Sequence, residues 1–314
     1  MTSMKNRIYG LICLKAKRCN FNADFTGRPR TDAKGNIIST DKALKYAIRN
    51  YWINNNEKVF FYKTMNEQLN PRTMKERYEN LFIPLSETKS STEVLKNLFS
   101  CADIESFGAT FTESKFNLSI PGAVQIQQGI NLYNDADIET IQILSPFRNP
   151  NDNKDGSQKS QSTIGEQIVI DRVQYVFNFS INPSNYNQFQ YLDDFTGYSK
   201  ENYEKFKEAS RIGVTSLNSC TKAGANNDMA LFIELEENSK LYLPDLVDYI
   251  NYEIEEGNTK AVYDISDLAF LESVSDEISS IEIYYNNYTT KIIHSFEKLN
   301  EKLSMYNIIT ATKL

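Results

Sequence analysis

The sequence predicts an α+β fold, because segments that alternate with the two-residue period of a strand are separated by segments with the helical repeat. The clearest strand is RVQYVFNFSI (172–181), in which every second residue from Val173 to Ile181 is apolar. The clearest helix starts after Ser39 or Thr40, either of which can cap it. One apolar stripe of this helix is formed by Leu44, Ala47, Ile48, Tyr51 and Trp52.

The order of the elements narrows the fold class. Along the chain we expect a strand at 7–14, a loop at 15–36 and then the helix, followed by strands at 107–112, 119–129, 138–144 and 172–181, a helix at 199–217, a strand at 229–237 and a closing helix at 289–303. This order fits a single domain over residues 1–314, an α+β sandwich of the ferredoxin-like or RNA-recognition type.

Two segments are interpreted as insertions into this domain. Residues 54–100 are polar and mostly helical in pattern, and they include an amphipathic helix at 87–99. Residues 145–165 contain almost no large apolar residue after Phe147, so little can anchor them to a core. We expect a long loop or a protruding hairpin there, which in a compact domain usually has a function or is disordered.

Composition excludes several classes of protein. There is no run of about 18 apolar residues, which excludes a membrane-spanning helix. The apolar run at 8–14 is short for a signal peptide and is followed by Lys15, Lys17 and Arg18, so a first strand is favoured. The four cysteines have neither the spacing of a zinc site nor the density of a disulfide scaffold, which favours the reducing cytoplasm.

Charge is unevenly distributed along the chain. The net charge is -7, yet residues 1–49 contain eleven Lys and Arg against three Asp, a local charge of +8. Residues 230–314 contain six Lys against sixteen Asp and Glu, a local charge of -10. A basic segment on an acidic body favours a confined anion-binding surface, and a phosphate backbone is the commonest ligand of such a surface. A solvated basic face remains the alternative.

The helix after residue 40 contributes part of this positive charge. Lys42, Lys45 and Arg49 follow each other at helical spacing, so we expect them to project together from one face. Like charges at this spacing are mildly destabilising, and a bound polyanion would offset that cost.

Few residues point to catalysis. The one histidine, His294, is expected on the closing helix without a recognisable nucleophile or acid, so we interpret it as structural or exposed. Neither a phosphate-binding glycine loop nor a set of His and Cys ligands is present. Asp24, Asp32 and Asp41 could hold a magnesium ion, but capping, turn formation and pairing with Arg are favoured. The sequence therefore predicts no cofactor and no metal.

Two further stretches suit contact with an extended strand. In SIPGAVQIQQG (119–129), Gln125 and Gln127 share one face of an alternating segment, and in NSCTKAGANND (218–228), Lys222 precedes Gly224 in a polar turn. Amides and exposed N–H groups contact sugars, phosphates and base edges. An edge strand with a solvated face is the alternative interpretation of the first stretch.

Several motifs together resemble a known family. NRIYGLICL, CNFNAD, GRPRTDAKGNIISTDKALKYAIRNY, ADIESFGATF, SIPGAVQIQQG, STIGEQIVIDRVQYVFNFSINP and SCTKAGA occur in the order and spacing of the backbone subunit of the CRISPR Cascade surveillance complex, a member of the RAMP superfamily. The sequence looks most like the subtype I-B form. The resemblance covers residues 5–235. The family often has Asn-Pro-Asn-Gly-Asp after the first strand, where this chain has Asn-Phe-Asn-Ala-Asp at 20–24.

The resemblance implies a fold and a role. It implies an RNA-recognition-motif (ferredoxin-like) palm with inserted helical fingers at 54–100 and a protruding thumb at 145–165. Copies of such a subunit would stack into a helical oligomer along the CRISPR RNA (crRNA) and present it for pairing with target DNA in antiviral defence. The implied partners are CRISPR RNA, neighbouring copies, the large subunit, the 5′-end-capping subunit and the guide-processing endonuclease, without a membrane. The role is non-catalytic and cytoplasmic.

The resemblance also implies which residues contact the guide RNA. Position by position, these are Arg18, Asn20, Asn22, Arg28 and Arg30 in the first loop, Ser39, Thr40, Lys42, Lys45 and Arg49 at the first helix, Gly122, Gln125 and Gln127 in the palm, Phe147, Lys159 and Ile164 in the thumb, and Lys222 and Gly224 in the closing turn. Related subunits of another CRISPR type cut RNA with an aspartate of the first loop, so a magnesium-dependent ribonuclease that uses Asp24 or Asp32 is one alternative. A protein-interaction module is another.

Overall fold

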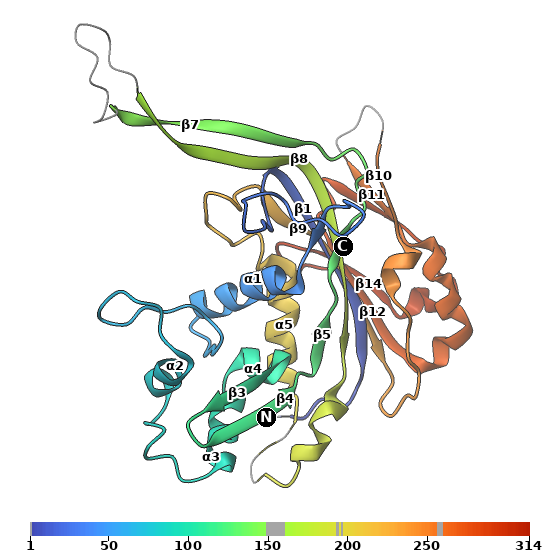
Figure 1. Ribbon diagram of the computed structural model, residues 1–314. Helices are drawn as coiled ribbons and strands as arrows, with labels where there is room; N and C mark the ends of the chain where they lie inside the picture. The colour runs from blue at the N-terminus through green and yellow to red at the C-terminus, as the bar shows by residue number, and fades with distance from the viewer. Residues whose placement is uncertain (1, 149–160, 193–194, 196, 256–259) are drawn as a thin grey trace, which may run out of the picture.

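The computed structural model describes residues 2–148, 161–192, 195, 197–255 and 260–314 (Figure 1). Its centre is a nine-stranded sheet with the order β14-β12-β9-β1-β8-β6-β2, and β5 and β7 also pair with β8. The strands of this sheet are β1 (Ile8–Cys19), β2 (Ile38–Ser39), β5 (Val124–Ile126), β6 (Gly129–Asn131), β7 (Ile138–Arg148), β8 (Gln161–Ile181), β9 (Ala225–Leu235), β12 (Ile278–Tyr285) and β14 (Leu303–Asn307).

The predicted mixed α+β class is confirmed. Strands β9, β1 and β8 are neighbours and antiparallel. Helix α1 (Asp41–Asn54) follows β1 in the chain, and helix α5 (Lys200–Ile212) leads from β8 to β9. The predicted helix at 199–217 ends five residues early, at Ile212, because the next N–H groups, of Val214 and Thr215, donate to Oδ1 of Asn227 on β9.

Each face of the sheet is covered by its own layer. In β8, the alternating residues predicted from the sequence, Val173 to Ile181, are buried with α1 and α5 on one face. On β1 and β9 the intervening residues, such as Leu11 and Leu231, pack against the C-terminal part of the chain on the other face. Figure 1 shows α1 and α5 on one side of the sheet and the orange and red C-terminal segments on the other.

Gly10 of β1 lies where the sheet leaves no room for a side chain. A Cβ at this position would collide with the carbonyl oxygen of Leu231 and lie 2.6 Å from the ring of Phe179. We expect Gly10→Ala to lower the free energy of unfolding by about 1–3 kcal/mol or more, the cost of overpacking. Urea unfolding measures this. The matched control is Gly165→Ala, whose Cβ would meet no atom within 4 Å. Equal midpoints for the two variants would contradict the expectation.

The C-terminal layer differs from the sequence prediction. It contains a three-stranded sheet, β10 (Asn251–Ile254), β11 (Ala261–Asp264) and β13 (Thr290–Ile293), with the 3₁₀ helices η2 (Leu246–Tyr249), η3 (Ser266–Glu277) and η4 (Lys298–Glu301). The predicted closing helix at 289–303 is wrong, because parallel pairing with β11 makes its first part a strand. His294 follows this strand, and its ring stacks on Phe296 with centroids 5.5 Å apart.

An inserted lobe joins α1 to β5. It contains α2 (Met74–Leu81), α3 (Ser91–Phe99), α4 (Ala102–Phe107) and a hairpin of β3 (Gly108–Glu113) and β4 (Phe116–Pro121). The prediction of a mostly helical segment at 54–100 is wrong, because turns separate α2 from α1 and α3. The single strand expected at 119–129 is divided into β4, β5 and β6, since Gly122 and Gly129 pack directly against Phe107 and Phe177.

A long hairpin of β7 and β8 projects from the sheet as an arm (Figure 1). Residues 138–144 therefore belong to this arm and not to the core. Residues 145–148 and 161–165 continue its two strands, which agrees with the protruding hairpin, one of the two expectations for this segment. Residues 149–160 lie outside the described part of the chain. The apolar side chains exposed on the arm are Ile138, Ile141, Ile143, Leu144 and Phe147.

The remaining helical element is the 3₁₀ helix η1 (Pro183–Phe189), which follows β8. In the residues that the structure describes, no helix is both long and apolar enough to span a membrane.

Candidate nucleic-acid interface

A groove runs along α1 and brings together residues from three separate segments. Two adjoining hollows, of about 480 and 300 Å³, share Tyr46 and Lys222 as a common wall. The first hollow is lined by Asn22, Arg30, Thr40, Lys42, Ala43, Tyr46 and Lys222. The second is lined by Tyr46, Asn50, Asn54, Ser216, Leu217, Asn218, Ser219 and Lys222. We call the two hollows together the α1 groove.

Asn22 fixes the first loop to the start of α1. Its Oδ1 accepts hydrogen bonds from the backbone N–H of Thr40 (2.7 Å) and from the Thr40 hydroxyl (3.0 Å). The same hydroxyl oxygen accepts from the N–H of Ala43, which makes Thr40, one of the two candidates from the sequence, the N-cap. The amide of Asn22 therefore holds the loop and the helix terminus in one arrangement.

Lys222 fixes the third segment. Its Nζ donates to the carbonyl oxygen of Phe21 and lies 5.3 Å from the centroid of that ring. Burial lowers the pKa of Lys222. Gly224 has a φ of +107° and packs against the backbone of Lys17, so a side chain there would both strain the turn and collide. The turn at 218–224 is thus held against the loop that follows β1.

The charge in the first hollow comes mainly from Arg30 and Lys42. The Lys42 side chain is 84% exposed, and its Nζ lies 2.9 Å from Asp41, an exposed ion pair that contributes little to stability. Within the described residues, Arg30 has no ion-pair partner, and its guanidinium lies 5.8 Å from the centroid of the exposed Phe25 ring. The start of α1 adds the partial positive charge of a helix N-terminus. The first hollow therefore suits an anion.

Of the three cations expected on one face of α1, Lys45 and Arg49 are mostly buried and paired within the chain. The Nε of Arg49 lies 3.0 Å from the buried carboxylate of Asp103, and the Nζ of Lys45 lies 3.1 Å from Asp41. Their side chains are only 15% and 14% exposed, and both lie 5.2 Å from the centroid of the Phe107 ring. Carboxylates of the chain thus neutralise these two cations. Their contact with RNA stays a prediction.

Other predicted residues lie outside the groove. Asn20 and Ser39 are buried beneath it, and the amide of Asn20 donates to the carbonyl of Gly27. Gly122 is buried, and its carbonyl accepts from the Gln125 amide. Exposed positions that line neither hollow are Arg18, Arg28, Gln125, Gln127 and Phe147. Ile164 lies in β8, and Lys159 lies outside the described residues.

The groove contains residues that the sequence interpretation did not include. They are Ala43, Tyr46, Asn50 and Asn54 on α1 and Ser216, Leu217, Asn218 and Ser219 after α5. The sequence contained a signal for Tyr46 and Asn50. They follow Lys42 at intervals of four residues, so the three side chains share one face of the helix. Asn218 and Ser219 belong to the polar turn at 218–228, which the sequence indicated through Lys222 and Gly224, whereas Ser216 and Leu217 carry no such signal.

Asp24 and Asp32 each organise a turn. Oδ1 of Asp24 accepts from the N–H groups of Thr26 and Arg28, and the carboxylate of Asp32 accepts from the backbone and side chain of Asn36. These hydrogen bonds lower the pKa of both carboxyl groups. In the described part of the chain, no three His, Cys, Asp or Glu side chains gather as they would around a metal ion.

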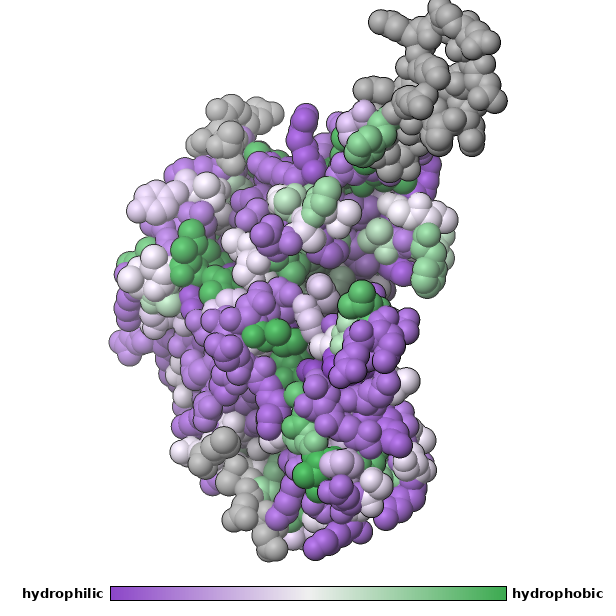
Figure 2. Space-filling model, turned by 90° about the vertical axis from the view of Figure 1, so that its left-hand side faces the viewer, coloured by the Kyte–Doolittle hydropathy of each residue, from purple (hydrophilic) through white to green (hydrophobic). Residues whose placement is uncertain are grey.

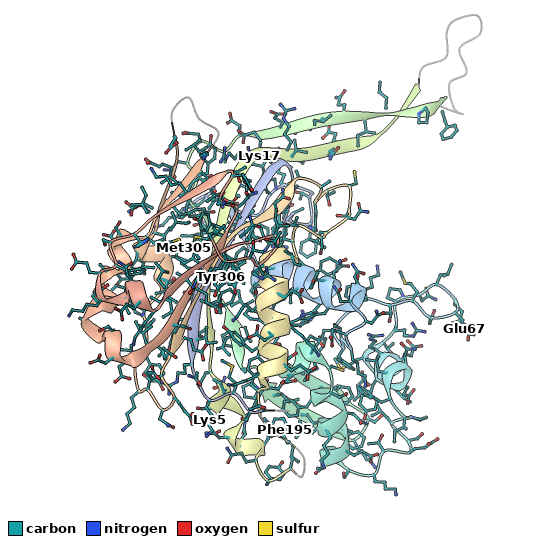
Figure 3. All side chains as sticks on the ribbon, turned by 180° about the vertical axis from the view of Figure 1, so that it is seen from behind. Lys5, Lys17, Glu67, Phe195, Met305 and Tyr306 are labelled. Carbon is teal, nitrogen blue, oxygen red and sulfur yellow. The ribbon has the colours of Figure 1, made fainter. Side chains whose placement is uncertain are left out.

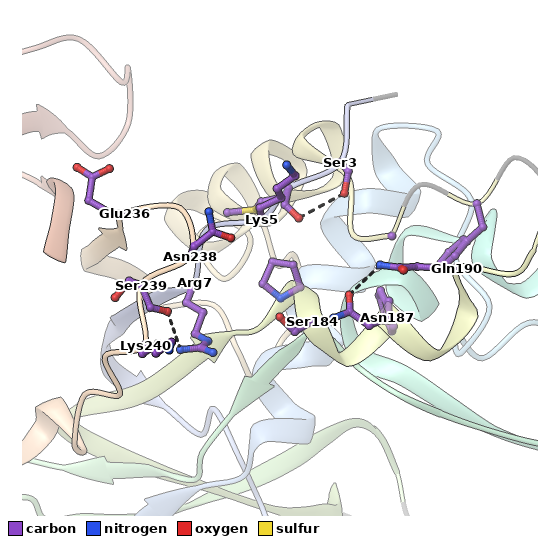
Figure 4. Close-up of a pocket in the computed structure, with 15 residues that line it drawn as sticks. Ser3, Lys5, Arg7, Ser184, Asn187, Gln190, Glu236, Asn238, Ser239 and Lys240 are labelled. Atoms are coloured by element: carbon purple, nitrogen blue, oxygen red, sulfur yellow. Dashed lines mark hydrogen bonds between the residues drawn. The ribbon is translucent and has the colours of Figure 1, made fainter.

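A second polar pocket lies at the opposite end of β1. It has a volume of about 700 Å³, and Figure 4 shows that its wall is mostly polar. Hydrogen bonds within the protein occupy several of its groups, as when Arg7 donates to the carbonyl of Ser239 and Gln190 donates to Asn187. Figure 3 shows the separation, with Lys17 near the base of the arm and Lys5 near this pocket. We assign no ligand to it.

The sheet, the inserted lobe, the arm and the groove define a class of protein, a mixed α+β protein with a groove that contains cations. Hydrophilic residues dominate the side of the molecule that carries the lobe and the arm (Figure 2). Residues 6–271 match the family described as CRISPR-associated protein Cas7. The chain belongs to this family.

Solved structures share its fold. One chain of a "CRISPR RNA-guided surveillance complex, pre-nicking" is similar with a TM-score of 0.54 and 10% sequence identity over 96% of each chain. A chain of a "CRISPR RNA-guided surveillance complex" gives a TM-score of 0.49 and 11% identity over 93% of this chain and 96% of that one. None of the curated proteins compared with the sequence matches it.

Proposed function

We propose that the chain is a non-catalytic backbone subunit of a CRISPR RNA-guided surveillance complex, of subtype I-B, which binds the guide RNA in the α1 groove. Membership of the Cas7 family supports this proposal, as does the similar fold of a surveillance-complex chain. The strand order β9-β1-β8, with β5 and β6 beside β8 and two connecting helices, supports an RNA-recognition-type palm. The inserted lobe would be the fingers and the arm the thumb.

One observation carries the proposal. The α1 groove joins Arg30, Lys42 and Lys222 from three segments into one channel beside a helix N-terminus, although the chain as a whole carries a charge of -7. Cations and N–H groups arranged along a channel bind the backbone of a single strand without reading its sequence. A subunit that accepts any guide requires this kind of contact.

The arm and the assembly follow from the same proposal. The exposed apolar side chains on the arm suit contact with a neighbouring copy, because apolar surface is usually covered in a complex. Copies would form a helical oligomer along the guide in the cytoplasm and present it to target DNA. The large subunit, the 5′-end-capping subunit and the guide-processing endonuclease would complete the complex.

The first test is purification with a guide. When the chain is expressed together with a CRISPR RNA, we expect a large RNA-containing particle whose absorbance ratio shows nucleic acid. A nucleic-acid-free monomer under these conditions would overturn the proposal. Incubation of the particle with labelled complementary RNA and Mg²⁺ tests the non-catalytic role. Regularly spaced cuts that Asp24→Ala or Asp32→Ala abolishes would establish the ribonuclease alternative instead.

Replacing the cations of the first hollow should weaken RNA binding in a salt-dependent way. We expect Arg30→Gln with Lys42→Gln to reduce affinity for single-stranded RNA and to flatten the plot of log K against log salt by about 1.4, because each phosphate contact contributes about 0.7. Titration at several salt concentrations measures both effects. The control is Lys298→Gln with Lys313→Gln, which removes the same charge outside the groove. Equal slopes in the two double variants would contradict the groove assignment.

A further inference from the structure

Tyr46 occupies a distinctive place in the α1 groove. It is one of the two residues that line both hollows, and its side chain is 44% exposed although it lies on a helix with a well-buried apolar stripe. A strand that passes from the first hollow to the second must cross it. An exposed aromatic ring in that position is available to a ligand instead of to the core.

Tyr62 supports this ring from the inserted lobe. The two rings are nearly parallel, with an interplanar angle of 7° and centroids 5.8 Å apart. The hydroxyl of Tyr62 donates to Oδ1 of Asn50 at 2.8 Å, which fixes the second ring to α1. Burial raises the pKa of Tyr62 to about 12, so its phenol stays neutral at physiological pH. The pair is thus an uncharged, braced aromatic surface.

The two hollows differ in chemistry. The first contains Arg30 and Lys42, which suit phosphate. Among the described residues that line the second, Lys222 is the only cation, and it donates to the carbonyl of Phe21. The other polar groups of the second hollow are amides and hydroxyls, which hydrogen-bond to base edges without charge. The second hollow therefore suits the uncharged part of a nucleotide.

We propose that Tyr46, braced by Tyr62, stacks on one base of the bound single strand at the boundary between the two hollows. The inference rests on the proposed function, because it assigns part of the same groove. Arg30 and Lys42 hold the phosphates that precede this base, and Asn50, Asn54 and Asn218 lie around its edge. Stacking on an aromatic ring tolerates any base, so this contact fixes the position of a nucleotide without selecting its identity.

The experiment compares binding of two nucleic-acid ligands, short oligoadenylate and the same sugar-phosphate backbone without bases. We expect Tyr46→Ala to reduce the affinity of the full chain for short oligoadenylate by roughly 5- to 150-fold, the effect of losing one stacked base. The slope against salt should stay that of the unsubstituted protein, because no phosphate contact is lost. For the same backbone without bases, Tyr46→Ala and the unsubstituted protein should bind equally. Tyr46→Phe should keep full affinity for both strands.

Two results would overturn the inference. Equal affinity of Tyr46→Ala and the unsubstituted protein for oligoadenylate would show that no base stacks there, and an equal loss on the strand without bases would show a general disturbance of the groove. If Arg30→Gln with Lys42→Gln still flattens the salt slope in either case, the proposed function stands and only the stacking fails. If the unsubstituted protein binds neither strand, both fail. Circular dichroism melting of Tyr46→Ala checks that α1 is retained.

Discussion

Asp103→Ala is expected to lower the free energy of unfolding by about 3–5 kcal/mol, the cost of breaking a buried ion pair by removing one partner. The Asp103 side chain is fully buried and accepts from Nε of Arg49 (3.0 Å) and from the N–H groups of Phe60 (2.7 Å) and Phe61 (2.9 Å). Its loss leaves one cation and two N–H groups without partners beneath the lobe. Urea unfolding measures the loss, and amide exchange should locate it in α1 and the inserted lobe.

Two further variants test the cause of this loss. Glu67→Ala removes an exposed carboxylate near the tip of the same lobe (Figure 3), and we expect a change within about 0.5 kcal/mol. Combining Arg49→Ala with Asp103→Ala should cost less than the sum of the single variants, since the two side chains form one pair. If the double variant loses as much free energy of unfolding as the two single variants together, the ion pair with Arg49 is not the source of the stability that Asp103 provides.

Asp228→Ala is expected to loosen the opposite layer. Asp228 of β9 is buried and accepts from Nζ of Lys15 (2.7 Å) on β1 and from the hydroxyl of Tyr263 (2.9 Å) on β11. The Thr290 hydroxyl on β13 also lies within 3.4 Å. We expect a loss of roughly 3 kcal/mol, at the low end for a buried pair because the Lys15 side chain is 18% exposed and can reach water. Urea unfolding and amide exchange measure the effect.

The location of the effect distinguishes the two buried carboxylates. In Asp228→Ala, the amides of β11 and β13 should lose protection while α1 keeps its own, which is the reverse of Asp103→Ala. Asp276→Ala, an exposed carboxylate of the same C-terminal layer, is the matched control and should leave exchange unchanged. Uniform loss of protection over the whole chain would contradict the assignment of Asp228 to this one layer.

The local pattern of apolar residues was sufficient to predict the helices and strands that bury a single face. The alternation from Val173 to Ile181 predicted β8, and the repeat from Leu44 to Trp52 predicted α1 with its cap at Ser39 or Thr40, because in both the core covers one face only. Among the residues of the first hollow that the family resemblance implied, Asn22, Arg30, Thr40 and Lys42 lie near each other in the chain, whereas the fold brings Lys222 to them from a distant turn.

Local sequence patterns did not predict the contacts between segments that lie far apart in the chain. Arg49 and Asp103 are separated by 54 residues, so the spacing on α1 indicated a cation for a bound polyanion and gave no sign of the carboxylate that the fold places beside it. The strand β13 forms against β11, which no helical repeat at 289–303 reveals. The second hollow forms between Tyr46 on α1 and residues such as Ser216 and Ser219, which follow a different helix.

The division of charge between the two faces of the sheet has a kinetic consequence. The α1 groove lies on one side of the sheet. Residues 230–314, with their local charge of -10, form the layer on the other side together with the sheet strands β12 and β14. Such a separation gives the molecule a large electric dipole, which turns the groove toward an approaching polyanion and turns the acidic layer away from it. The polyanion would then reach the protein with the groove already facing it. Added salt should slow association more than it speeds dissociation.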